Sequence, residues 1–220
     1  MRLQILQAAT APARLRILLL PGIHQQPEDF IQAGFGERLR AVRADAELLL
    51  FLPELTHVDD RDWLAPLQQI LTETPAARGL WLGGISLGAF MALRAASSLS
   101  SPPDGLCLLA PYLGSRLMTA GIAAAGGLAR WQAGVNPESD DDRRIWRYAR
   151  TLGLGRPRVF LGLSDADRFA DSQRLLAAAL PPECVSTTQG PHDWPAWRQL
   201  WDNFLTRHVA HTPPEDCVRP

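Results

Sequence analysis

The chain has 220 residues, of which 46% are hydrophobic and 20% are charged, and this balance is that of a folded globular protein rather than a disordered one. Its 22 basic and 23 acidic residues give a formal net charge of −1, which excludes the strongly charged surface that attracts nucleic acids or anionic membranes. The length suits one sizeable domain, so we expect a single domain over residues 1–210 and a short tail over 211–220.

No segment of the sequence predicts a membrane span or a secretion signal. The apolar run Ile17–Leu20 is too short for the core of a signal peptide, and Leu117–Leu128 is interrupted by glycines and too short to cross a bilayer. Cys107, Cys184 and Cys217 are an odd number of cysteines without metal-ligand spacing, which indicates a reducing compartment. We therefore expect a cytoplasmic protein that needs neither a metal nor another cofactor.

Short apolar runs bounded by Gly, Pro or Asp recur along the chain, and such runs are typical of strands buried on both faces. The predicted strands are residues 15–20, 48–52, 80–82 with their flanks, 106–109, 159–163 and 184–188. Segments with helical spacing lie between them, at about residues 29–43, 59–72, 87–98, 141–152, 167–180 and 194–208. Strands that alternate with helices predict a mostly parallel central sheet covered on both sides, which is a three-layer α/β/α sandwich.

One segment, at about residues 112–156, interrupts this alternation. It contains the small-residue run Thr119–Gly127, a breaker at Asn136-Pro137 and the charged cluster Ser139–Arg144, which leads into a predicted helix. The cluster predicts a solvated helix start, with its aspartates facing the positive end of the helix dipole. A small mobile cover over a cleft is the functional alternative, and we expect a short cap-like insertion here.

The stretch Leu82–Gly88, LGGISLG, places Ser86 at the centre of a G-x-S-x-G pattern between a predicted strand and a predicted helix. At a sharp strand-to-helix turn the serine is exposed on strained backbone, and side chains two residues before or after it would clash. Gly84 and Gly88 meet that requirement. A serine hydroxyl is a weak nucleophile, so a base, an acid that orients the base and an oxyanion site must accompany it.

The chain has five histidines that compete for the role of base: His24, His57, His192, His208 and His211. The sequence QGPHDWP favours His192, because it places that residue in a loop between the last predicted strand and the last predicted helix.

For the orienting acid, the loop after residues 159–163 offers Asp165 and Asp167. A turn role competes for Asp165 and a helix N-cap role for Asp167, so the residues alone leave both open.

Backbone amides for an oxyanion site are available in LLLPGIHQ, which follows the first predicted strand. Ile23 is the first choice there, His24 is its alternative, and Leu87, directly after Ser86, supplies the second amide. Each such donor lowers a reaction barrier by about 3 to 4 kcal/mol. Tyr112 follows the strand at residues 106–109 and is a candidate substrate-binding residue, because pockets in such sheets lie at the carboxyl ends of strands.

Taken in chain order, four stretches resemble the α/β-hydrolase superfamily: LLLPG before an oxyanion loop, GISLG as a nucleophile elbow, GLSDADRF after a late strand and GPHDWPAW before the closing helix. The resemblance implies an esterase-like or lipase-like serine hydrolase with a small or minimal cap, Ser86 as nucleophile and His192 as base. It favours Asp167 over Asp165 as the acid, because Arg168 and Phe169 supply the basic or aromatic residue that follows the acid in many members. Many members have His-Gly where this chain has Pro21-Gly22, so the glycine alone aligns the oxyanion loop.

The resemblance also implies a reaction. A carboxylic ester or related acyl bond of a small molecule is cleaved through an acyl-enzyme on Ser86, and water activated by His192 releases the acid. An acyltransferase or a thioesterase would use the same three residues. A non-catalytic protein that keeps the fold and binds a ligand or a partner is the third alternative.

Overall fold

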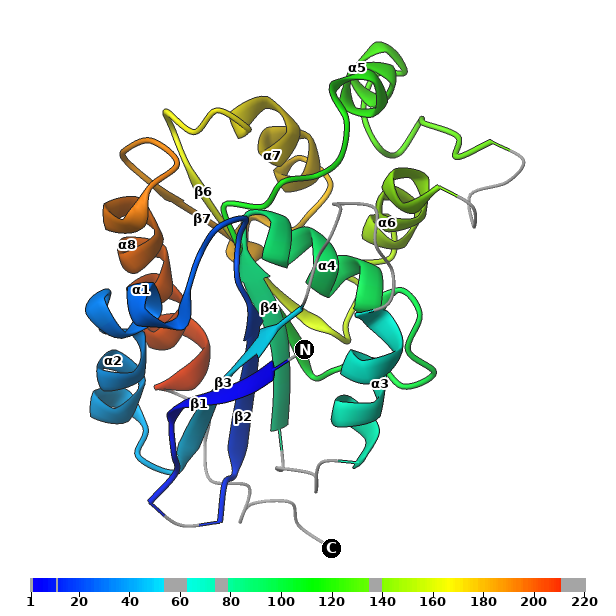
Figure 1. Cartoon of the computed structure of the whole chain (residues 1–220). Helices are drawn as coiled ribbons and strands as arrows, with labels where there is room; N and C mark the ends of the chain where they lie inside the picture. The colour runs from blue at the N-terminus through cyan, green and yellow to red at the C-terminus, as the bar shows by residue number, and fades with distance from the viewer. Residues whose placement is uncertain (1, 11, 54–62, 74–78, 135–139, 211–220) are drawn as a thin grey trace, which may run out of the picture.

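The computed structural model describes residues 2–10, 12–53, 63–73, 79–134 and 140–210. Its centre is a seven-stranded sheet in the order β1-β3-β2-β4-β5-β6-β7 (Figure 1). The strands are β1 (Arg2–Gln7), β2 (Leu15–Leu20), β3 (Ala46–Leu52), β4 (Gly79–Ile85), β5 (Gly105–Leu109), β6 (Arg158–Ser164) and β7 (Val185–Thr188). The α-helices are α1 (Pro27–Gln32), α2 (Phe35–Val42), α3 (Leu64–Glu73), α4 (Leu87–Ala96), α5 (Arg116–Ala124), α6 (Asp141–Ala149), α7 (Ala170–Ala177) and α8 (Trp194–Phe204). A short 3₁₀ turn, η2 (Pro182–Cys184), precedes β7, and a π-helical turn, η3 (Leu205–Val209), continues α8.

The sheet is parallel except at one edge, where β1 pairs with β3 in the antiparallel sense. All five residues of β5 are buried, as are four consecutive residues at the end of β2, because helices cover both faces of these strands. The register aligns Leu20 with Gly84 and Ile85 with Leu109, so the carboxyl ends of β2, β4 and β5 lie side by side. The prediction of a three-layer, mostly parallel α/β/α fold is therefore confirmed.

Two hydrophobic cores lie on the two faces of the sheet. Successive strand residues point to opposite faces, so Leu18 and Leu20 enter one core while Ile17 and Leu19 enter the other. Residues of α3, α4, α5, α6 and α7 complete the first core, and residues of α1, α2 and α8 complete the second. Figure 1 shows α1, α2 and α8 on one side of the sheet and α3, α4 and α6 on the other.

The structure differs from the sequence prediction in several elements. Strand β1 was not predicted, and the single helix expected at about residues 29–43 is two helices, α1 and α2, separated by Gly34 at φ +74°. A left-handed residue breaks the helical hydrogen-bond pattern, and glycine adopts that conformation at little cost. Helix α5 was also not predicted. The start of the helix expected at about residues 59–72, the tail 211–220, His57, His211 and Cys217 lie outside the described residues.

Helices α5 and α6 occupy the segment for which a cap-like insertion is expected. The prediction of a solvated start for α6 is wrong for two of its three aspartates. Asp140 caps the helix by accepting the Arg143 amide at 3.2 Å, but Asp141 pairs with the buried Arg94 of α4 at 2.6 Å. Asp142 accepts the Ser115 amide at 2.7 Å, which ties α6 to the start of α5. Both of these carboxylates therefore have tertiary partners.

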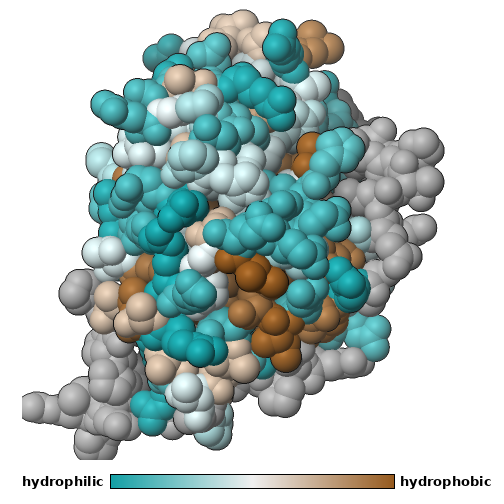
Figure 2. All heavy atoms as spheres, turned by 60° about the vertical axis from the view of Figure 1, so that its left-hand side comes forward, coloured by the Kyte–Doolittle hydropathy of each residue, from teal (hydrophilic) through white to brown (hydrophobic). Residues whose placement is uncertain are grey.

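The described part of the surface includes several exposed hydrophobic side chains. Figure 2 shows a face that is mostly hydrophilic, with hydrophobic side chains gathered in its lower half. On the edge strand β1, Leu3 is 40% exposed and Ile5 is 61% exposed. Within the described residues, no helix combines the length and apolar character that a bilayer span requires, and no three His, Cys, Asp or Glu side chains gather to hold a metal ion.

Candidate active site

Ser86 lies at the tight turn between β4 and α4, with backbone angles φ +55° and ψ −116° that non-glycine residues rarely adopt. A Cβ atom on Gly84 would lie 2.4 Å from the Gly88 carbonyl carbon, and one on Gly88 would lie 2.0 Å from the Leu20 oxygen. Both distances are far below a van der Waals contact, so the turn requires glycine at both positions. The Ser86 amide donates to the Leu109 oxygen at 3.0 Å, which fixes the turn to the end of β5.

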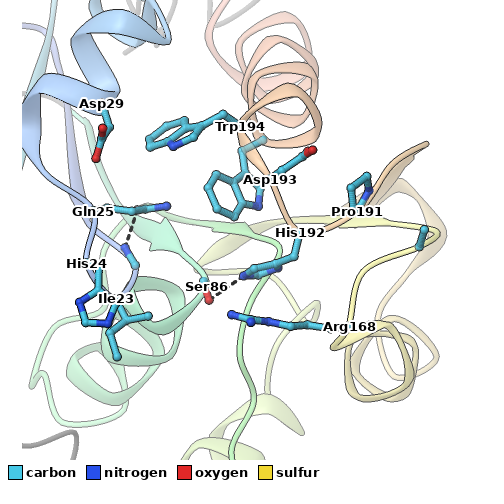
Figure 3. A pocket seen from close by; sticks show the side chains of 13 residues that line it. Ile23, His24, Gln25, Asp29, Ser86, Arg168, Pro191, His192, Asp193 and Trp194 are labelled. Atoms are coloured by element: carbon cyan, nitrogen blue, oxygen red, sulfur yellow. Dashed lines mark hydrogen bonds between the residues drawn. The ribbon is translucent and has the colours of Figure 1, made fainter.

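A chain of hydrogen bonds runs from Ser86 through His192 to Asp167. Ser86 Oγ lies 2.9 Å from His192 Nε2, and His192 Nδ1 lies 2.7 Å from Asp167 Oδ2 (Figure 3). An ionised carboxylate only accepts hydrogen bonds, so the hydrogen of a neutral imidazole belongs on Nδ1. Nε2 then accepts the hydrogen of the Ser86 hydroxyl. The fold thereby joins two residues that are 106 positions apart in the sequence.

Asp167 is held in its charged form by the groups around it. Burial favours the neutral form, but hydrogen bonds from His192, from the Phe169 amide and from the Gln173 side chain outweigh burial and lower the pKa of Asp167 below its ordinary value. The Phe169 amide donates to Asp167 Oδ1 at 2.7 Å. The Asp167 side chain is completely buried, so a negative charge is maintained against the imidazole without contact with water.

Gln173 is part of this arrangement and was not predicted. It lies on α7, is completely buried, and its Nε2 donates to the Pro111 oxygen at 3.2 Å. Because Pro111 follows β5, Gln173 connects the loop that carries Asp167 to the neighbouring strand end. Its position among the polar residues of a helix carries no sequence signal that distinguishes it from a solvent-exposed glutamine.

Asp165, the alternative acid, has different partners. Its Oδ1 accepts the Gly190 amide at 3.0 Å, and its own amide donates to the Thr188 oxygen at 3.0 Å. Ser164 Oγ adds a hydrogen bond to the Pro191 oxygen at 3.2 Å. These contacts stabilise the loop that precedes His192. Asp165 therefore supports this loop, whereas Asp167 contacts the imidazole.

The predicted oxyanion residues lie beside Ser86. The register of β2 with β4 brings the loop after Leu20 to the elbow, and Ile23 and His24 line the same cavity as Ser86. The Gly22 amide is already engaged, because it donates to Gln25 Oε1 at 2.6 Å (Figure 3). Leu87 is the first residue of α4, where a helix leaves the amides without intrahelical acceptors. The roles of the Ile23, His24 and Leu87 amides stay predictions.

Two cavities adjoin the Ser86 region. The first, of about 570 Å³, is lined by Gly22, Ile23, His24, Gln25, Asp29, Ser86, Ala166, Arg168, Pro191, His192, Asp193, Trp194 and Trp197. The second, of about 930 Å³, is lined from α5, α7 and the loop after β5, and Tyr112 forms part of its wall. Tyr112 therefore borders the second cavity and not the first, and its substrate-binding role stays a prediction.

His208 lies away from this site. Its ring packs against Trp81 and Phe204, with ring centres 4.9 and 5.8 Å away. Burial, together with the positive charges of Arg158 and Arg207, lowers the pKa of His208 to about 4. This histidine is therefore neutral at physiological pH and belongs to the aromatic packing of α8.

Comparisons with known proteins show the family and the fold of the chain. The family model described as the alpha/beta hydrolase family matches residues 13–216, whereas no curated protein sequence matches the chain. A monoacylglycerol lipase from Paleococcus ferrophilus is similar in fold, with 16% identity, a TM-score of 0.59, and coverage of 94% of this chain and 100% of that one. YbtT, a type II thioesterase of yersiniabactin biosynthesis, is 19% identical at a TM-score of 0.53, over 95% of this chain and 97% of that one. The S-formylglutathione hydrolase FrmB from Staphylococcus aureus is 14% identical at a TM-score of 0.54, over 90% and 82%. With its seven-stranded sheet and a match over nearly its whole length, the chain belongs to the alpha/beta hydrolase family.

Proposed function

We propose that the protein is a serine hydrolase that cleaves a carboxylic ester or related acyl bond of a small molecule, with Ser86 as nucleophile, His192 as general base and Asp167 as the orienting acid. The observation that carries this proposal is the continuous hydrogen-bonded chain from Ser86 Oγ to the buried carboxylate of Asp167. Membership of the alpha/beta hydrolase family supports it, as do structural neighbours named as a lipase, a thioesterase and an S-formylglutathione hydrolase.

The reaction follows from the tautomer of His192. Nε2 takes the Ser86 proton while Oγ bonds to the substrate carbonyl carbon, and the charge that develops on the carbonyl oxygen is stabilised by the Ile23 and Leu87 amides. The imidazolium then gives its proton to the leaving alkoxide or thiolate, which leaves an acyl group on Ser86. Water enters, gives a proton to Nε2 and bonds to the acyl carbon; the acyl–Oγ bond then breaks, and the imidazolium returns its proton to Ser86 Oγ as the acid is released.

The charge of Asp167 matters most while His192 is an imidazolium. The lowered pKa of Asp167 keeps the carboxylate ionised at neutral pH, so it stabilises the cation that forms on the neighbouring ring. The hydrogen bonds from Phe169 and Gln173 then fix the carboxylate in the orientation that His192 Nδ1 requires. Proton transfer is thereby confined to Nε2, the nitrogen next to Ser86.

The proposal extends to a cap beside the site and to the cellular location. We propose that α5 and α6 belong to a short cap beside the site, and α5 contributes one wall of the second cavity. We propose a cytoplasmic location, because Cys107 and Cys184 are free thiols and a reducing compartment keeps thiols free.

The test is the mass of the intact protein after incubation with an uncharged fluorophosphonate. Wild type is expected to gain one adduct and Ser86→Ala none. His192→Ala and Asp167→Asn are expected to react at least about 10³-fold more slowly than wild type. Asp165→Asn is the matched control for Asp167→Asn, because the two carboxylates are two residues apart and only one contacts the imidazole.

An adduct that persists in Ser86→Ala, or a folded wild type that gains none, would refute the proposal. Larger slowing in Asp165→Asn than in Asp167→Asn would reassign the acid. Oxygen esters, thioesters and added alcohol acceptors with the same acyl group then separate an esterase from a thioesterase or an acyltransferase.

A further inference from the structure

Arg168 lies in the walls of both cavities beside Ser86. It directly follows Asp167, and its guanidinium carbon lies 4.9 Å from the centre of the Phe169 ring. That ring meets the His192 ring edge to face, with centres 5.1 Å apart. Figure 3 shows the Arg168 side chain reaching from the side of α7 toward Ser86, next to His192. A substrate that passes from the first cavity to the second would therefore pass the guanidinium.

The carboxylates that line these cavities are engaged elsewhere. Asp29 accepts the Gln26 amide at 2.8 Å at the start of α1, and Asp193 accepts the Ala196 amide at 3.2 Å at the start of α8. Asp171 pairs with Arg174 at 3.2 Å. Among the residues that the structure describes, Arg168 forms no ion pair, and its guanidinium lies over the Phe169 ring.

The second cavity is positively charged overall. Its lining includes three arginines, Arg116, Arg168 and Arg174, against one acidic residue, Asp171. Three positive charges and one negative charge give the lining of this cavity a formal balance of +2. A hollow with an excess of one sign of charge concentrates ligands of the opposite sign.

We propose that Arg168 is a specificity-determining residue that binds an anionic group of the substrate, a carboxylate or a phosphate, while the acyl carbonyl lies at Ser86. The planar guanidinium offers paired N–H donors that match two oxygens of either group. The remainder of the substrate continues into the second cavity between α5 and α7. This inference rests on the proposed function, because it requires an acyl group at Ser86.

The test compares para-nitrophenyl esters in matched pairs that share the same acyl chain. The carboxylate pair is the monoadipate ester and its uncharged adipamate counterpart, and the phosphate pair is the ω-phosphonooxyhexanoate and ω-hydroxyhexanoate esters. The measured quantity is the ratio of kcat/KM for the anionic ester to that for its neutral partner, after subtraction of the Ser86→Ala rate. Monoglutarate and monosuberate esters vary the distance between carbonyl and charge.

The wild type is expected to prefer the anionic member of at least one pair by about 10- to 100-fold, and Arg168→Gln to bring that ratio near one. Arg168→Lys should retain part of the preference and Arg168→Glu should reverse it, which a merely structural role would not do. Arg198→Gln is the matched control, because Arg198 is an exposed arginine of α8 outside both cavities and its loss changes the net charge equally. This variant should keep the wild-type ratio.

The outcomes separate this inference from the proposed function. A wild-type ratio near one in every pair, with Ser86 labelled normally by the uncharged fluorophosphonate, overturns the inference alone. An Arg168→Gln variant that slows both members equally also overturns it, because the ratio is then independent of Arg168. Absence of both labelling and turnover refutes the proposed function and the inference with it.

Discussion

Two glycine-rich stretches of the chain use glycine for opposite reasons. In Leu82–Gly88, a Cβ atom on Gly83 would lie 2.1 Å from the Cys107 oxygen, and those on Gly84 and Gly88 would be similarly crowded. In Thr119–Gly127, by contrast, a Cβ atom on Gly121 would meet nothing within 4 Å. Glycine content alone therefore does not separate a tightly packed turn from an exposed helix, and the surroundings of each glycine decide its role.

The helices α4 and α5, which overlap these two stretches, also differ in how deeply they are buried. Every residue of α4, directly after Ser86, is buried, whereas Ile122 is the buried residue of α5 and Leu117 is 86% exposed. Strained backbone such as that of Ser86 persists only where its surroundings over-determine it. The packing around α4 supplies that constraint, and α5 is free to serve as a wall of the second cavity.

The largest effect is expected from Gly88→Ala. The added Cβ atom would lie 2.0 Å from the Leu20 oxygen, and this neighbour is backbone at the buried carboxyl end of β2 and cannot rotate away. We expect the free energy of unfolding, measured by urea denaturation, to fall by about 3 kcal/mol or more. Fluorophosphonate labelling of Ser86 should fall with it. Wild-type stability and labelling in this variant would show that the elbow tolerates a side chain and that the contrast is wrong.

A smaller loss is expected where α6 is anchored to α4. Asp141→Ala leaves Arg94, whose side chain is 7% exposed, without its carboxylate partner, and an unpaired buried charge costs about 3 kcal/mol. Asp140→Ala removes the same charge from the same cluster, but it removes an N-cap hydrogen bond worth about 1 kcal/mol and a half-exposed ion pair with Arg143 worth up to about 1 kcal/mol. Denaturation of both variants measures the difference. Equal losses would contradict the assignment of the ion pair as the anchor of α6.

The sequence predicted well those features that local pattern determines. Continuous apolar runs such as LRILLL indicate strands buried on both faces, and the G-x-S-x-G pattern requires a strand-to-helix turn. Strand β1 escaped prediction because Leu3 and Ile5 point partly to solvent and the strand is held at the sheet edge by pairing with β3. The break at Gly34 escaped because helical spacing continues across it.

The features that sequence left open depend on partners far along the chain. Asp165 and Asp167 both suit a turn or a cap, and only the position of His192, 25 residues after Asp167, distinguishes their surroundings. The partner of Asp141 is Arg94, 47 residues earlier, so the local charge pattern alone predicts a solvated helix start. Gln173 meets Pro111 across 62 residues, and no local pattern encodes that contact.

The smallest effect, and the one of opposite sign, is expected from Gly121→Ala in α5. Glycine inside a helix is less favourable than alanine by up to about 1 kcal/mol, and the space around Gly121 is open, so the substitution should stabilise the protein by about 0.5 kcal/mol. Gly127→Ala is the matched control, because that glycine has equally open surroundings but a φ of +104°. Alanine there should destabilise the protein by about 1 kcal/mol through backbone strain alone. Opposite signs in urea denaturation would establish that conformation, and not space, sets the need for glycine in α5 and its following turn. A loss of stability in Gly121→Ala would instead mean that a packed surface covers this face of α5.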